Sequence, residues 1–207
     1  MLLQPGDSVL FQGDSITDAG RNRDDRDHLG GGYAMQAAAW FAALHPGVPV
    51  TFLNRGISGN RAIDLAARWT PDCVALTPTV VSILIGINDT WRRYDGNDQT
   101  SAETFAAHYR VILGRCRDEL RARLVICEPF LTEVPKVAGW REDLGPKIEV
   151  ARALAREFKA TYVPFDGIFA QMSTRREPRF WAEDGVHPSS AGHALMAKAW
   201  LEAVGAL

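Results

Sequence analysis

Short, nearly continuous apolar runs alternate along the chain with longer segments of helical periodicity. The runs occupy residues 9–11, 50–53, 80–85, 124–127 and 162–165. They are rich in β-branched and aromatic side chains and show no polar alternation, which is typical of strands buried on both faces of a parallel sheet. The pattern therefore predicts five parallel strands.

Amphipathic segments between and after these runs predict helices. The clearest one carries an apolar stripe made of Phe105, Tyr109, Ile112, Leu113, Cys116 and Leu120. Thr100 and Glu103 are expected to form a capping box at its start. Further helices are expected over residues 148–158 and from about residue 189 to residue 204. Strand–helix alternation of this kind predicts an α/β fold, a three-layer α/β/α sandwich with a five-stranded parallel sheet.

Length and composition fit a single domain over residues 1–207. Hydrophobic residues make up 46% of the chain and charged residues 23%, the usual balance of a globular protein. The 23 lysines and arginines nearly balance the 25 aspartates and glutamates, so no positive field would attract nucleic acid. No apolar run approaches the roughly 20 residues that span a bilayer, so no membrane partner is expected.

The N-terminus and the cysteines indicate the compartment. The chain begins MLLQPGD, without a basic region followed by an apolar one, so we expect no secretory signal and a cytoplasmic location. Cys73, Cys116 and Cys127 are too far apart for a CxxC pair. An odd, sparse set of this kind predicts reduced thiols that fill the core.

Candidate chemistry lies in the loops after the predicted strands, because sites in parallel α/β sheets form at the carboxyl ends of the strands. Ser15 follows the first strand, Gly59 follows the second and Asn88 follows the third. Each has an ordinary alternative: Ser15 could only cap a helix, Gly59 could only serve a turn, and Asn88 could only close a strand. Taken singly, none of them decides the function.

The sequence DGVHP near the C-terminus favours a functional interpretation. Asp184 lies three residues before His187, and Pro188 restricts the backbone that follows. The carboxylate can therefore fold back to accept a hydrogen bond from the imidazole and leave the other ring nitrogen basic. The competing interpretation is a helix-capping turn with an incidental histidine.

The loops that carry Ser15, Gly59 and Asn88 and the DGVHP segment, in this order along the chain, resemble the SGNH (GDSL-type) hydrolase superfamily. The resemblance extends from LFQGDSITD at residues 10–18 to HPSSAGH at residues 187–193. Within the superfamily the chain is most similar to cytoplasmic carbohydrate esterases that deacetylate xylo-oligosaccharides. Three segments carry that narrower likeness: GISGN at 56–60, IGINDTWRRY at 85–94 and PFLTE at 129–133. The segment 134–146 shows no such likeness, and its loops could redirect specificity.

The resemblance implies a flavodoxin-like SGNH hydrolase fold and a serine esterase that needs neither cofactor nor metal. Ser15 would be the nucleophile, His187 the general base and then general acid, and Asp184 the residue that orients His187. The oxyanion hole would consist of the backbone N–H groups of Ser15 and Gly59 and the side-chain amide of Asn88. The substrate would be a small acylated molecule, an acetylated sugar above all. Relatives of this type are often oligomeric, so a homo-oligomer stays open.

Neighbouring acids and aromatic residues receive separate interpretations. Asp14 and Asp89 are interpreted as residues that tie strand-end loops together, and Asp18 as a helix or turn cap. Five aromatic residues are placed in loops: Tyr33, Trp91, Tyr94, Trp140 and Trp181. Because sugar rings stack on aromatic faces, Trp91, Trp181 and Tyr33 are the candidates for substrate contact.

Three other functions remain to be distinguished. A metal-dependent phosphoesterase could use Asp14, Asn88 and Asp89 as ligands, but no histidine adjoins those loops. A non-catalytic carbohydrate-binding protein could use the aromatic residues alone. A thioesterase or lysophospholipase of the same superfamily would share the serine mechanism. The esterase hypothesis predicts activity that needs neutral His187 and falls below about pH 6.

Overall fold

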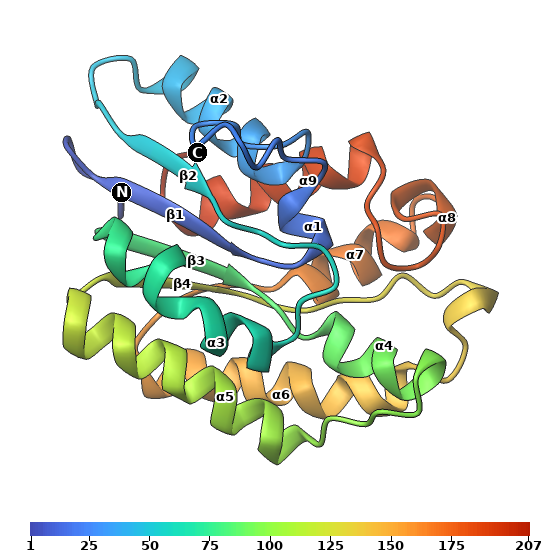
Figure 1. Ribbon diagram of the computed structural model, residues 1–207. Helices are drawn as coiled ribbons and strands as arrows, with labels where there is room; N and C mark the ends of the chain where they lie inside the picture. The colour runs from blue at the N-terminus through green and yellow to red at the C-terminus, as the bar shows by residue number, and fades with distance from the viewer.

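A computed structural model of the chain describes residues 1–207 and has a parallel β-sheet at its centre with helices on both faces (Figure 1). The strands are β1 (Ser8–Gly13), β2 (Thr51–Asn54), β3 (Val80–Leu84), β4 (Arg123–Cys127) and β5 (Thr161–Val163). All neighbouring pairs are parallel and the order is β2-β1-β3-β4-β5. This is the flavodoxin-like order of a doubly wound sheet, so the fold class expected from the sequence is confirmed.

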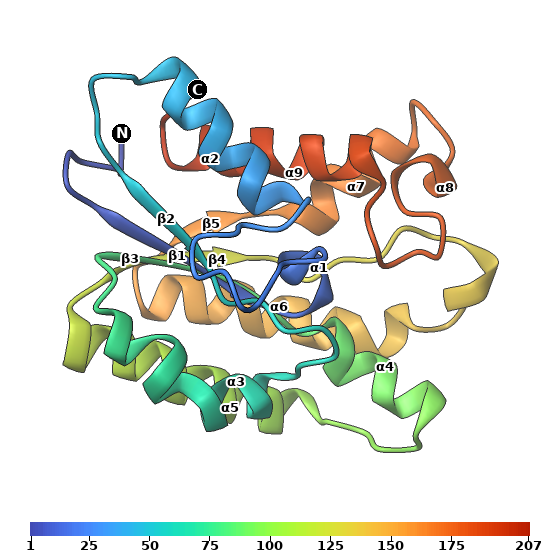
Figure 2. The same cartoon turned by 45° about the horizontal axis from the view of Figure 1, so that its top comes forward.

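The helices form one layer on each side of the sheet (Figure 2). The longer ones are α2 (Tyr33–Leu44), α3 (Ala62–Asp72), α5 (Ala102–Arg115), α6 (Arg141–Glu157) and α9 (Ser190–Ala203). α2 and α9 cover one face, and α3, α5 and α6 cover the other. The shorter helices are α1 (Ser15–Asp18), α4 (Ile87–Asp95), α7 (Phe165–Ser173) and α8 (Pro178–Trp181). Single-turn 3₁₀ segments occur at η1 (Val74–Leu76) and η3 (Pro135–Val137), and η2 (Cys116–Leu120) is a π-helical turn.

Two apolar clusters hold the layers together, one on each side of the sheet. β3 is buried along its whole length, as a strand with helices over both faces must be. On the α9 side, the Trp200 ring lies 5.1 Å from the Phe11 ring, and its indole Nε1 donates to Ser82 Oγ at 2.9 Å. The one polar atom of this large side chain is thereby satisfied inside the core.

Element boundaries differ from the sequence prediction at several places. The helix expected over residues 148–158 is α6, which already begins at Arg141. The run 162–165 does not stay extended, because β5 ends at Val163 and α7 begins at Phe165. The expected capping box at Thr100 is also wrong. Ser101 is the N-cap of α5, and its hydroxyl accepts the backbone N–H of Thr104 at 3.2 Å. The sequence correctly indicates a helix start here, but the N-cap lies one residue later than predicted.

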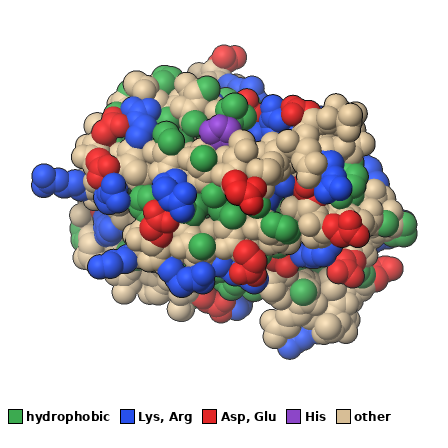
Figure 3. All heavy atoms as spheres, turned by 90° about the horizontal axis from the view of Figure 1, so that it is seen from below, with side chains coloured by type: hydrophobic (Ala, Val, Ile, Leu, Met, Phe, Trp, Pro, Cys, Tyr) green, Lys and Arg blue, Asp and Glu red, His purple; other side chains and the backbone are tan.

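Surface and thiol features agree with the composition. All three cysteines are buried and free, and burial raises the pKa of Cys127 to about 12. On the face seen in Figure 3, positive and negative side chains are interspersed. Pairs such as Arg110 and Glu157, whose Nη2 and Oε2 lie 2.8 Å apart, join α5 to α6. None of the helices has the length and apolarity that crossing a bilayer would require.

Candidate active site

The candidate site lies where three adjacent strands end. β1 lies between β2 and β3, and the three strands run in the same direction. The loops after them carry Ser15, Gly59 and Asn88 respectively. Residues that are more than 70 positions apart in the chain are thus brought to one edge of the sheet.

Ser15, His187 and Asp184 are connected by hydrogen bonds in series. Ser15 Oγ lies 2.9 Å from His187 Nε2, and His187 Nδ1 lies 2.8 Å from Asp184 Oδ2. Asp184 Oδ1 accepts the backbone N–H groups of Val186 at 2.9 Å and His187 at 2.8 Å. In this arrangement the imidazole can take the proton of the serine hydroxyl as that oxygen attacks a carbonyl carbon.

The local sequence explains why Ser15 is presented in this way. Ser15 is the first residue of α1, and Asp14 caps the helix by accepting the N–H of Ile16 at 3.0 Å. Gly13 allows the tight passage from β1, because a Cβ there would meet Leu84 O and Thr17 Oγ1 at 2.4 Å. The serine hydroxyl and its own N–H therefore stand together at a helix N-terminus, where N–H groups have no intrahelical partner.

The loop that carries Asp184 and His187 is closed by a contact between its two ends. An isolated antiparallel bridge pairs Ala182 with Pro188, and Ser189 caps α9 by accepting the N–H of Gly192 at 3.2 Å. Gly185 has φ +88°, and a Cβ there would come within 2.7 Å of Val137. The turn between acid and histidine thus needs glycine for both conformation and space.

His187 and Asp184 each stabilise the charged form of the other. The hydrogen bond to Asp184 raises the pKa of His187 above its ordinary value, against the opposing effect of partial burial. Burial alone would raise the pKa of Asp184, but hydrogen bonds from the ring and backbone of His187 outweigh it and hold this pKa well below its usual range. The carboxylate is therefore ionised whenever the imidazole has to act as a base.

Asn88 and Gly59 flank the serine. Asn88 donates one N–H of its amide to Asn60 O at 3.1 Å, and the amide has a second N–H with which to reach a ligand. Gly59 has φ +84°, a conformation that favours glycine, and no heavy atom lies within 4 Å of the position a Cβ would take. These two residues and the N–H of Ser15 can together face a developing oxyanion.

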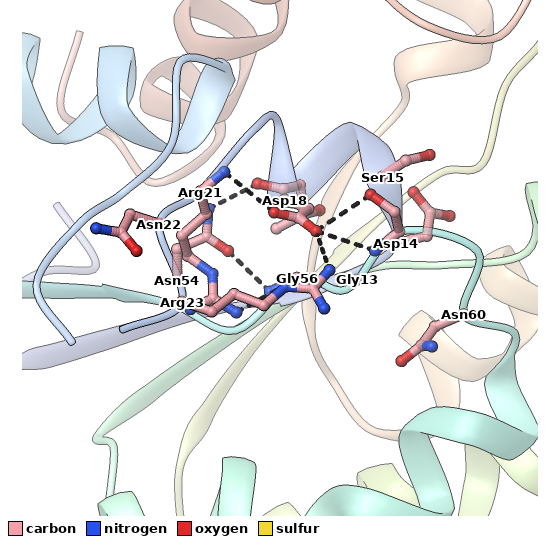
Figure 4. A network of polar contacts seen from close by, with 12 residues as sticks. Gly13, Asp14, Ser15, Asp18, Arg21, Asn22, Arg23, Asn54, Gly56 and Asn60 are labelled. Atoms are coloured by element: carbon pink, nitrogen blue, oxygen red, sulfur yellow. Dashed lines mark hydrogen bonds and ion pairs between the residues drawn. The ribbon is translucent and has the colours of Figure 1, made fainter. Parts of the chain in front are cut away.

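The neighbouring acids make structural contacts. Asp89 Oδ2 accepts the N–H of Ala62 at 3.1 Å and so ties the β3 loop to α3. Asp18 Oδ1 accepts the N–H of Arg21 at 3.1 Å, as a cap would (Figure 4). Its Oδ2 accepts both the N–H and the hydroxyl of Ser58 at 3.1 Å. Burial raises the pKa of Asp89 to about 7.

The aromatic candidates for substrate contact differ in their exposure and in their distance from His187. Trp91 is partly exposed on α4, and its ring lies 5.9 Å from the His187 ring, so it borders the site. Tyr33 is not in a loop but begins α2, and it is fully buried with its hydroxyl 3.1 Å from Thr17 Oγ1. The expectation that Tyr33 contacts substrate is therefore wrong.

Trp181 also lies in a helix rather than in a loop. It belongs to α8, is 8% exposed, and donates its indole N–H to Arg176 O at 3.3 Å. Its ring packs edge-on against Phe180. The side chain fills the apolar cluster beneath the histidine loop, so its faces are not free to stack on a sugar.

A pocket beside His187 has no signal in the sequence. It has a volume of about 530 Å³ and is lined by Val134, Lys136, Arg179, Glu183, Asp184 and His187. Lys136 belongs to η3 and Arg179 to α8, two short elements with no motif to mark them. Val134 and Lys136 of the segment 134–146 therefore line a pocket that borders His187. No group of three or more His, Cys, Asp or Glu side chains lies together as a metal site would need.

Comparison with known proteins identifies relatives over nearly the whole chain. Residues 11–195 match the model of the GDSL-like Lipase/Acylhydrolase family. An acetylxylan esterase of Geobacillus stearothermophilus is 34% identical over 212 residues, which cover 99% of this chain and 97% of the relative.

Solved structures give the same picture. A protein of Parabacteroides merdae described as a GDSL-like lipase superposes with a TM-score of 0.94 at 35% identity, covering 99% of this chain and 98% of the other. The crystal structure of an acetylxylan esterase from Geobacillus stearothermophilus superposes with a TM-score of 0.92 at 33% identity, covering 99% and 97%. Catalytic mutants of that enzyme carry alanine in place of a serine and of a histidine.

Proposed function

The chain belongs to the GDSL-like lipase/acylhydrolase family and is a carboxylic ester hydrolase, and on that basis we propose that it deacetylates xylo-oligosaccharides or similar small carbohydrates through an acyl-enzyme on Ser15. The observation that carries the assignment of residues is the hydrogen-bonded series Ser15–His187–Asp184. It has the order and polarity that a serine nucleophile requires.

In the first half-reaction Ser15 Oγ attacks the ester carbonyl while His187 Nε2 takes the hydroxyl proton. The tetrahedral intermediate collapses when the same nitrogen returns that proton to the departing sugar oxygen, which leaves the acetyl group on Ser15. Water then attacks the acyl-enzyme, with His187 acting as base and acid in the same way, and acetate leaves. Asp184 stabilises the imidazolium that forms twice in this cycle.

The negative charge on the carbonyl oxygen would be stabilised by three donors from three loops: the N–H of Ser15, the N–H of Gly59 and the side-chain amide of Asn88. Preorganised donors of this kind contribute the largest single electrostatic effect in acyl transfer. The free N–H of the Asn88 amide and the open space in front of Gly59 support this role.

Two observations support an acetylated carbohydrate as substrate. The first is the similarity to an acetylxylan esterase over 99% of this chain. The second is the setting of His187, which has the partly exposed ring of Trp91 on one side and the polar pocket of Lys136, Arg179 and Glu183 on another. A polar alcohol portion suits these surroundings better than a long alkyl chain does.

An acyl-chain series tests this proposal. Hydrolysis of p-nitrophenyl esters of increasing acyl length, and acetate release from acetylated xylo-oligosaccharides, would be measured for wild type, Ser15→Ala and the control Ser173→Ala on α7. We expect the acetyl substrates to be fastest, Ser15→Ala to be inactive and Ser173→Ala to match wild type. A preference for acyl chains beyond about eight carbons would instead indicate the thioesterase or lysophospholipase function. Hydrolysis that survives in Ser15→Ala would contradict the mechanism.

A further inference from the structure

We infer that Arg68 is a positioning residue that holds the loops of the oxyanion hole in register with Ser15. The inference rests on the proposed function, because it concerns the same hole. Arg68 lies on α3, the helix that follows the loop of Gly59, and its side chain is only 14% exposed. No sequence motif marks it, and it touches no residue assigned to proton transfer.

The guanidinium of Arg68 joins two of the three loops directly. Nη2 donates to the carbonyl oxygen of Gly13 at 3.3 Å, and Nε donates to Asn60 Oδ1 at 2.7 Å. Gly13 precedes Ser15 by two residues, and Asn60 follows Gly59 directly. Arg68 thus sets the separation between the backbone segments that carry two of the three proposed donors.

Asn60 extends this connection to the third donor. Its side chain accepts from Arg68, and its backbone carbonyl accepts from the Asn88 amide at 3.1 Å. A shift of Asn60 would therefore move the Gly59 N–H and release the orientation of the Asn88 amide together. Arg68 is thus connected directly to the loop of Ser15 through Gly13, and through Asn60 to the loops of Gly59 and Asn88.

A second partner fixes the guanidinium itself. Nη1 donates to Asp72 Oδ2 at 2.9 Å, one helical turn further along α3. The carbonyl of Asp72 in turn accepts from Gln12 Nε2 at 2.7 Å, which links the end of α3 to β1. Three nitrogens of one planar group thus donate to three separate partners, a geometry that lysine cannot reproduce.

The alternative is that Arg68 only fastens α3 to the sheet and contributes to stability alone. A positioning role and a stability role differ in their kinetic effect. Misplaced oxyanion donors weaken interactions that are made in the transition state, so kcat falls while KM changes little. A loss of folded protein also lowers the apparent kcat at unchanged KM, but it leaves the affinity of each folded molecule for a tetrahedral inhibitor unchanged, so inhibitor affinity separates the two roles.

The test compares Arg68→Ala, Arg68→Lys and Asn60→Ala with the control Arg110→Ala, which removes an exposed arginine that pairs with Glu157. Kinetics on p-nitrophenyl acetate would be measured together with inhibition by a small alkylboronic acid, which forms a tetrahedral adduct on the nucleophilic serine. We expect Arg68→Ala to lower kcat by roughly tenfold to a hundredfold with KM within about threefold. The boronic acid should bind more weakly by a similar factor.

The other variants sharpen the test. In Arg68→Lys the decrease in log kcat relative to wild type should be more than half of the decrease in Arg68→Ala. Asn60→Ala should lower kcat several-fold, and this variant tests the inference even if Arg68→Ala fails to fold. Arg110→Ala should match wild type. Wild-type kcat and boronate affinity in folded Arg68→Lys and Asn60→Ala would overturn the inference. Failure of the proposed function would look different, because Ser15→Ala would then hydrolyse ester as fast as wild type.

Discussion

The Asp184 carboxylate accepts hydrogen bonds from His187 at two points. Oδ1 accepts the backbone N–H at 2.8 Å, and Oδ2 lies 2.8 Å from ring Nδ1. Backbone and ring are therefore fixed by one side chain three residues earlier. The tautomer with the proton on Nδ1 is favoured, and the lone pair of Nε2 faces Ser15 Oγ.

Replacement of this acid by its amide tests the tautomer. In Asp184→Asn the amide oxygen can keep the backbone hydrogen bonds, while its N–H₂ group would face Nδ1 and force the proton onto Nε2. The base would then present a proton to Ser15 instead of a lone pair. We expect kcat to fall by roughly 10³–10⁴-fold with little loss of thermal stability. A decrease of less than about tenfold in steady-state kinetics would contradict the role assigned to Asp184.

The acidic limb of the pH–rate profile should lie higher than the sequence analysis predicted. Catalysis needs neutral His187, and its hydrogen bond to Asp184 raises the pKa above the ordinary 6.5. Activity should therefore decline as the pH falls through a value above 6.5, not only below about pH 6. The measurement is kcat/KM from about pH 5 to about pH 9.

Lys136 offers a matched variant for this profile. Its positive charge, in the same pocket, lowers the pKa of His187. Lys136→Gln should therefore move the acidic limb to higher pH, whereas Lys159→Gln, which lies outside that pocket, should not. A shift of the limb to lower pH in Lys136→Gln would show that another group controls it.

A buried carboxyl at position 89 should make stability depend on pH. Burial raises the pKa of Asp89 from 3.8 to about 7, so the folded protein binds an extra proton between these values. The free energy of unfolding contributed by this group is therefore present at low pH and lost as the pH rises through about 7. Asp89→Asn should be more stable than wild type above that pH, by on the order of a few kcal/mol, and equal to it near pH 4.

Urea unfolding at acidic and at mildly alkaline pH measures this difference. Asp89→Asn keeps an amide oxygen that can accept the N–H of Ala62, so the loop connection survives. Asp24→Asn in an exposed loop serves as the control and should show no such trend. Equal stabilities of wild type and Asp89→Asn at both pH values would show that the carboxyl is ionised without cost.

The buried ion pair of Lys147 and Asp143 within α6 predicts unequal effects of removing its two members. Lys147 is 1% exposed and donates to Asp143, which also accepts from Arg93 at 3.2 Å and from Gln99 at 3.3 Å. Asp143→Ala leaves a buried ammonium without a carboxylate and should destabilise the protein by about 3–5 kcal/mol. Lys147→Met should cost less, because Arg93 and Gln99 still compensate Asp143. Chemical denaturation of both variants checks the order, and a larger loss in Lys147→Met would contradict it.

The sequence predicted the sheet well because buried parallel strands leave a strong local signal. The continuous apolar run at 80–85 corresponds to β3, which is buried along its whole length. At β5 the same signal failed, since Phe165 is equally apolar as the first residue of α7. Apolar character reports burial, and only the turn at Pro164 separates strand from helix there.

The site was predictable where chemistry requires a particular residue type at a strand end. Ser15, His187 and Asp184 come together as expected, because strand ends and a short loop determine their positions. Tyr33 was misplaced because aromatic side chains suit a core and a sugar site equally well. Arg68 could not be predicted, since its partners lie 55 and 8 residues away and only the folded chain brings them together.

The bridge between Ala182 and Pro188 closes the acid–base loop into a compact unit. Thr132, in the segment after β4, holds this unit by donating its backbone N–H to Gly185 O at 2.9 Å and its hydroxyl to Ala182 O at 3.2 Å, whereas Ser15 takes its position from the end of β1. The base and the nucleophile are therefore positioned by different segments of the chain. Transplanting residues 182–188 of a homologous hydrolase would exchange the basic partner while leaving the nucleophile and its anion-stabilising loops untouched.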